Sequence, residues 1–199
     1  MPPDRKDPIP QGFDWDVWLG PAHVRPFVKD TYHPFKWRGW WDFGSGALGD
    51  IACHAMDAAF GALELGYPTA VEAKAGPMTS ESPPNWSQIT IEFPARGDRP
   101  PVKVVWNDGY GKGERPAEYD VPRPKDLEPD RVLPGVPKKG GKRYGIGGQL
   151  IIGDKATIMA GVYCRSPRVI PEAKMRDLLK NHKVEKTIPR CDGGHYREW

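Results

Sequence analysis

The chain has 199 residues, a formal net charge of +3 at pH 7 and 38% hydrophobic residues. These values are typical of a globular chain with one domain, or one domain with tails, and they argue against wholesale disorder. The charge is too small to indicate a nucleic-acid partner, and no apolar run approaches the length of about 18 residues that a membrane span needs. The three cysteines are few and odd in number, which argues against a disulfide framework. We therefore expect a soluble protein that binds neither nucleic acid nor membrane. The expected compartment is the cytoplasm, and export remains open because an export signal could lie upstream of these residues.

The first half of the chain is rich in aromatic residues. Residues 1–12 carry prolines and charges and are expected to form an extended lead-in to a domain over residues 13–199. The segment 13–19 (FDWDVWL) is aromatic and apolar, and the segment 32–43 (YHPFKWRGWWDF) holds three of the eight tryptophans. Small and apolar residues then fill Asp50–Leu65 up to a Gly-Tyr-Pro stop, which predicts a largely buried helix.

Alternating apolar and polar residues predict strands after this helix. The predicted strands are 69–75, 88–93, 102–106, 149–152 and 157–162. A turn rich in Pro, Gly and Asp separates the second from the third, so we expect these two to be antiparallel neighbours.

A stretch rich in Gly and Pro, residues 107–148, interrupts the strands and is predicted to be a long loop. Near the end of the chain, residues 171–181 are predicted to be a helix with Pro at its first position, and residues 195–199 the first turn of another. Strands and helices do not alternate along the chain. The predicted fold class is therefore α+β, an open, mostly antiparallel β-sheet with helices packed on one face.

Three glycines directly before the predicted helix, Gly44, Gly46 and Gly49, match the pattern G-x-G-x-x-G. A dinucleotide-binding turn needs a buried strand ahead of it, so that the pyrophosphate meets the N-terminus of the helix. The preceding residues 38–43 (RGWWDF) include two charges and a glycine and do not resemble such a strand. We predict a tight turn that brings the backbone close to another segment, and no cofactor-binding residue in this chain.

Asp50 and His54 are four residues apart in the predicted helix, so both side chains project from one face. A neutral imidazole beside a carboxylate is suited to abstracting the proton of a substrate hydroxyl. The same spacing fits an aspartate that caps the helix and a histidine packed in the core. Spacing alone favours this second interpretation.

A longer motif surrounds this pair. The run WRGWWDFGSGALGDIACHAMD at residues 37–57, preceded by FDWDVWLGP at residues 13–21, resembles the C-terminal domain of the bacterial glucose–fructose oxidoreductase, inositol dehydrogenase and MocA (Gfo/Idh/MocA) family. Weaker similarity continues along nearly the whole chain. The resemblance implies a sheet that mediates homo-oligomerisation and a sugar, polyol or related compound as substrate. It also implies a separate N-terminal domain that binds NAD or NADP in the full-length parent.

The resemblance also implies roles for the Asp–His pair. His54 would be the acid/base for the hydroxyl being oxidised, and Asp50 would contact the substrate or orient the histidine. The family's catalytic lysine, in an E-K-P-like motif of the N-terminal domain, has no counterpart in this sequence. We therefore expect that the nucleotide-binding half is missing, that the C-terminus stops early, and that this chain alone is inactive and binds no cofactor. The alternative is a stand-alone, non-enzymatic binding or scaffold domain.

The aromatic segment ahead of the pair supplies candidate substrate contacts. Trp37 and Arg38 are the first candidates, and Tyr32 and His33 the weaker ones, because indole faces stack on sugar rings and guanidinium groups donate to hydroxyls. Packing of these aromatic residues in the core explains them equally well.

A metal site is not expected. The residues from which one could be built are His33, Asp50, Cys53 and His54. Cys53 and His54 are adjacent in sequence, so they point to different faces of the predicted helix and do not suit one tetrahedral site.

Overall fold

The computed structural model describes residues 4–109, 148–182, 185, 187, 189 and 191–198. Most of the predicted loop over residues 107–148 lies outside these ranges. Residues 4–12, the expected lead-in, contain neither helix nor strand.

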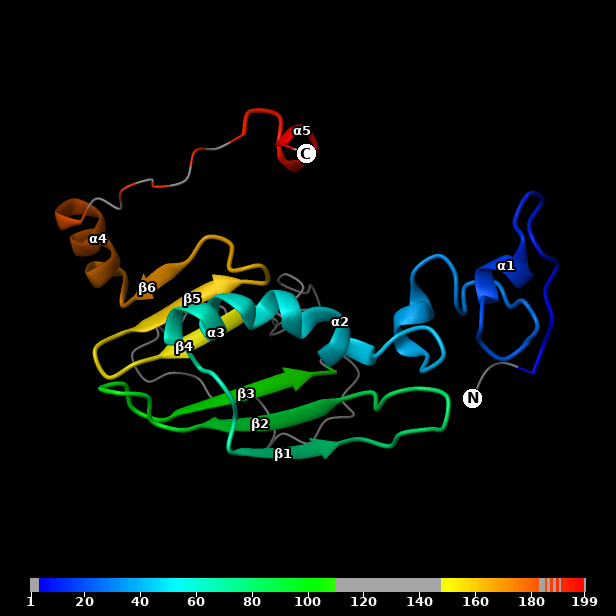
Figure 1. Cartoon of the computed structure of the whole chain (residues 1–199), viewed down its shortest axis with the longest axis horizontal. Helices are drawn as coiled ribbons and strands as arrows, with labels where there is room; N and C mark the ends of the chain where they lie inside the picture. The colour runs from blue at the N-terminus through cyan, green and yellow to red at the C-terminus, as the bar shows by residue number, and fades with distance from the viewer. Residues whose placement is uncertain are drawn as a thin grey trace, which may run out of the picture.

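The N-terminal part of the chain folds around aromatic side chains, at one end of the molecule (Figure 1). Helix α1 (Trp15–Leu19) begins at Asp14, whose carboxylate accepts a hydrogen bond from the Val17 backbone N–H. It ends at Gly20, which adopts a positive φ of 58°. The buried side chains of this part are Trp15, Leu19, Phe27, Val28 and Tyr32. These residues form a core of their own that anchors the segment leading to α2.

The helix predicted over residues 50–65 is two short helices with different boundaries. After the 3-10 helix η1 (Lys36–Gly39), helix α2 (Gly46–Ala55) begins before the predicted start, and α3 (Asp57–Leu63) follows it. The prediction of a largely buried helix is wrong, since Gly46 is the one buried residue of the two helices. Many residues of these helices are alanine or glycine. Their side chains are apolar but too short to be buried against neighbouring elements. Because α2 begins early, Asp50 lies in its middle and His54 in its last turn.

The strands of the described residues form two antiparallel sheets of three strands each, where we expected one sheet. The first sheet has the order β1 (Ala70–Ala75), β2 (Ser87–Phe93), β3 (Val102–Asp108), and the second has the order β4 (Gly148–Ile152), β5 (Thr157–Gly161), β6 (Arg168–Ile170). The expected antiparallel pairing of the second and third predicted strands is confirmed as β2 with β3. Strand β6 was not predicted, because three residues are too few to show an alternation.

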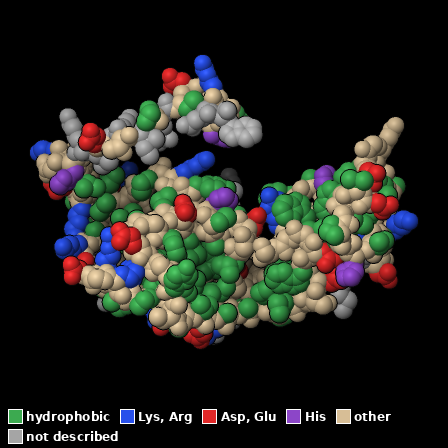
Figure 2. Space-filling model, in the orientation of Figure 1, with side chains coloured by type: hydrophobic (Ala, Val, Ile, Leu, Met, Phe, Trp, Pro, Cys, Tyr) green, Lys and Arg blue, Asp and Glu red, His purple; other side chains and the backbone are tan. Residues whose placement is uncertain are grey.

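Helices α2 and α3 lie along one face of the first sheet (Figure 1). The ring of Phe60 in α3 meets that of Phe93 in β2 edge-on, with centroids 6.3 Å apart. Because side chains alternate along a strand, Ile89 and Ile91 share the face of Phe93. Figure 2 shows hydrophobic side chains gathered where these helices lie over the sheet. The α+β class with antiparallel strands is therefore confirmed.

The C-terminal part carries two more helices. Helix α4 (Glu172–Asn181) follows Pro171 and packs next to β6, close to the predicted range, and α5 (His195–Glu198) is a single turn. None of the helices within the described ranges is long and apolar enough to cross a membrane.

The glycine-rich turn before α2 brings the backbone at Gly44 close to the backbone at Arg38. A Cβ added at Gly44 would lie 2.7 Å from both the Cα and the carbonyl oxygen of Arg38. Gly46 adopts a positive φ of 70°, which disfavours any side chain there. The chain enters this turn from η1 and not from a strand. The predicted tight turn is confirmed, and the geometry of a dinucleotide-binding turn is not present at these glycines.

We expect Gly44→Ala to lower the free energy of unfolding by about 1–3 kcal/mol, because the added methyl group meets backbone atoms that cannot rotate away. Gly61→Ala in α3 is the matched control, since nothing lies within 4 Å of its added Cβ. This control should raise the free energy of unfolding by about 0.5–1 kcal/mol, through the higher helix propensity of alanine. Urea denaturation of both variants measures the difference. Equal effects at the two positions would contradict the close approach.

Candidate active site

The candidate site is built on η1 and α2, which the turn at Gly44 brings side by side. The Arg38 Nε lies 3.0 Å from Asp50 Oδ2, and both side chains are about one-third exposed. An ion pair with this exposure contributes on the order of 0–1 kcal/mol to stability. Its main effect is therefore to fix the direction of the Asp50 carboxylate.

Arg38 is itself held in place by aromatic neighbours. Its Cζ lies 4.2 Å from the ring centroid of Phe35 and 4.4 Å from that of Trp37. The Arg38 Nη1 also donates to the Phe35 carbonyl oxygen at 3.3 Å. A guanidinium group has five N–H donors, so Arg38 keeps donors for a ligand hydroxyl after it has bound Asp50 and Phe35.

His54 lies one helical turn beyond Asp50 and is exposed. Its ring centroid is 4.9 Å from that of Tyr163, with the ring planes at 57°. Tyr163 comes from the connection between β5 and β6, far from α2 in sequence. No local sequence pattern marks Tyr163 as a site residue, because it directly follows a predicted strand. In the contacts of the described residues, Asp50 pairs with Arg38 and His54 with Tyr163.

Of the two weaker substrate candidates, Tyr32 lies in the N-terminal core and His33 lies on its surface. Tyr32 is 1% exposed, and its ring centroid is 4.9 Å from that of Trp40. His33 is exposed, with its ring 4.7 Å from that of Phe13. None of their described contacts is with Arg38, Asp50 or His54. The structure thus brings Trp37 and Arg38 together with the Asp–His pair, and it places Tyr32 and His33 in a separate cluster.

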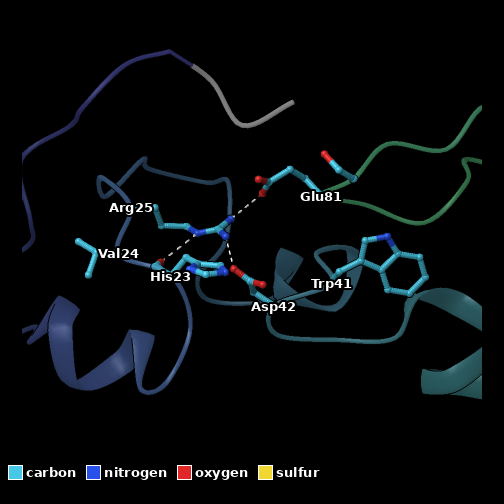
Figure 3. A pocket seen from close by; sticks show the side chains of 7 residues that line it. His23, Val24, Arg25, Trp41, Asp42 and Glu81 are labelled. Carbon is cyan, nitrogen blue, oxygen red and sulfur yellow. Dashed lines mark hydrogen bonds and ion pairs between the residues drawn. The ribbon is translucent and has the colours of Figure 1, made fainter.

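Arg25 binds two acidic side chains that come from different loops (Figure 3). Its guanidinium donates to Asp42 and, at 2.9 Å, to Glu81, and its side chain is 11% exposed. The lining of the adjacent cavity of about 420 Å³ is His23, Val24, Arg25, Trp41, Asp42, Ser80 and Glu81. Arg25 ties the segment that leads into the Gly44 turn to the β1–β2 connection. No sequence pattern marks Arg25, because its partners lie 17 and 56 residues away along the chain.

The charge state of Arg25 follows from these contacts. Burial by itself lowers the pKa of the guanidinium, but hydrogen bonds to Tyr32 and Glu81 and the charges of Glu81 and Asp42 outweigh it. The net result is a pKa above the ordinary value for arginine. Arg25 therefore stabilises the folded state at every pH below the ordinary pKa of arginine. This stabilisation is lost only as the pH rises above that value.

The described ranges contain no group of three His, Cys, Asp or Glu side chains that could hold a metal ion. In particular, His33 packs in the N-terminal cluster, whereas Asp50 and His54 lie on α2.

We compared the sequence with models of known protein families. Residues 4–99 match the model of an oxidoreductase family, C-terminal alpha/beta domain, of the Gfo/Idh/MocA type. The match includes η1, the glycine-rich turn and α2, and thus every predicted site residue. This part of the chain is a C-terminal domain of the Gfo/Idh/MocA oxidoreductase family, which confirms the resemblance seen in the sequence. A comparison with curated proteins found no match.

Proposed function

We propose that this chain is the substrate-binding and oligomerisation half of an NAD(P)-dependent oxidoreductase that acts on a hydroxyl of a sugar, a polyol or a related compound. The observation that carries the proposal is the exposed imidazole of His54 one helical turn from a carboxylate, Asp50, that Arg38 holds in place. The family match over residues 4–99 supports the same class of reaction.

The chain's own residues act on the substrate and on one proton. The His54 imidazole accepts the proton of the substrate hydroxyl as the carbon that bears it is oxidised. The Asp50 carboxylate accepts a hydrogen bond from a neighbouring hydroxyl, and a remaining N–H of Arg38 donates to another. The half-buried indole of Trp37 offers an apolar surface to the C–H groups of a sugar ring.

The cofactor belongs to another domain in this proposal. When bound, NAD or NADP supplies the acceptor of the hydride that leaves the same carbon. The glycine-rich turn of this chain does not fit a dinucleotide, because η1 and not a strand leads into it. We propose that an N-terminal domain of the parent enzyme holds the cofactor, and that the isolated chain is inactive.

We also propose that the chain forms a homo-oligomer with further copies of itself through the first sheet. Strand β1 is at the edge of this sheet, and all six of its residues are exposed. An exposed edge strand can pair with the same strand of a second copy.

The proposal is tested by sequencing the DNA that flanks the coding region and by assaying the protein encoded there. We expect an upstream nucleotide-binding domain, and formation of NADH or NADPH when the joined protein meets a panel of sugars and polyols. The isolated chain, assayed beside it, should show no turnover. Stop codons at both ends, or a joined protein inactive on the whole panel, would contradict the proposal and favour a stand-alone binding or scaffold domain.

A further inference from the structure

The connection between β5 and β6 has an unusual backbone. Tyr163, Cys164 and Ser166 all adopt positive φ angles, of 49°, 52° and 50°. Residues other than glycine rarely adopt this conformation, because the Cβ crowds the backbone. The turn is closed by a hydrogen bond from the Gly161 N–H to the Arg165 carbonyl oxygen at 3.0 Å. It places the Tyr163 ring against that of His54 in α2.

The Tyr163 ring has two charged or titratable neighbours. The His54 ring lies 4.9 Å away, centroid to centroid, and the Cζ of Arg165 lies 5.5 Å from the Tyr163 ring centroid. Tyr163 is 55% exposed, so it packs on His54 without enclosing it. A tilted ring pair at this distance is an attractive contact and favours this relative orientation of the two rings.

Asp50 does not restrain His54 in this way. Its carboxylate is bound to Arg38, and no hydrogen bond in the described residues joins it to His54. The orientation of the imidazole therefore depends on a contact from the second sheet. We propose that Tyr163 is a positioning residue of the site, whose ring sets the plane of the His54 imidazole for proton transfer; the catalytic part of this inference rests on the proposed function.

Nuclear magnetic resonance of the full chain tests the contact without a substrate. The ring-proton resonances of His54, assigned with His54→Gln, should shift by more than their line width in Tyr163→Ala, because the ring current of Tyr163 is lost. Tyr163→Phe keeps the ring and should leave these resonances near their original positions. Tyr67→Ala is the matched control, since Tyr67 is 92% exposed and makes no ring contact in the described residues. Unchanged His54 resonances in Tyr163→Ala would overturn the proposal.

Kinetics of the joined oxidoreductase test the role. Tyr163→Ala should lower kcat about 10- to 100-fold with little change in KM, as expected for a misoriented base, and Tyr163→Phe should restore kcat. A shifted resonance with an unchanged kcat would overturn the positioning role alone. Absence of turnover in every variant, wild type included, would instead contradict the proposed function, and the resonance measurement would still decide whether Tyr163 contacts His54.

Discussion

Replacing His54 by glutamine is expected to lower the kcat of the joined oxidoreductase by about 100- to 10,000-fold, the range that general acid–base catalysis contributes. Glutamine keeps a polar side chain of similar length but cannot accept and release the substrate proton. The free energy of unfolding should change by less than about 0.5 kcal/mol, because His54 is exposed in the last turn of α2. Steady-state kinetics and urea denaturation of the same preparation measure both quantities.

A second histidine provides the control for this experiment. His182, at the C-terminal end of α4, is exposed and lies outside the site. His182→Gln should retain both kcat and stability. If His54→Gln turned over substrate as fast as this control, His54 would not be the base, and its contact with Tyr163 would be a matter of packing.

Replacing Tyr32 by alanine is expected to lower the free energy of unfolding by about 3–5 kcal/mol, the usual cost of removing a large buried aromatic side chain. Tyr32 is 1% exposed and packs against Trp15 and Trp40, with ring centroids 5.8 Å and 4.9 Å away. Tyr32→Phe keeps the ring, and with it the ring's position 5.6 Å from the Arg25 Cζ, and removes only the hydroxyl, so it should cost no more than about 1 kcal/mol. Urea denaturation followed by tryptophan fluorescence measures these differences.

This experiment also distinguishes the two interpretations of Tyr32 that the sequence left open. A core residue loses stability on truncation, as stated above. A substrate contact would instead raise KM in Tyr32→Phe while the stability of Tyr32→Ala stayed close to that of wild type. Tyr67→Ala, at a position that is 92% exposed, should change the free energy of unfolding by less than about 0.5 kcal/mol and is the reference for both variants.

The local patterns of the sequence were sufficient for much of the architecture. Alternation along residues 88–93 and 102–106 predicted β2 and β3, and their antiparallel pairing is confirmed. A helix over residues 171–181 was predicted from the proline at its start, and α4 begins one residue later, with Pro171 as its N-cap. These elements depend on neighbours in sequence, so their signal is visible without the fold. The helix over residues 50–65 was misjudged, because small apolar residues are compatible with both a buried and a loosely covered helix.

The sequence by itself determined the α+β class, the family of residues 4–99 and the presence of an aspartate and a histidine on one face of a helix. Only the tertiary structure decided what these two residues touch. Arg38 meets Asp50 because Gly44 lets the chain return close to η1, and Tyr163 meets His54 because the β5–β6 connection reaches α2. Neither contact leaves a signal in local composition or periodicity, since each joins segments that are brought together by packing.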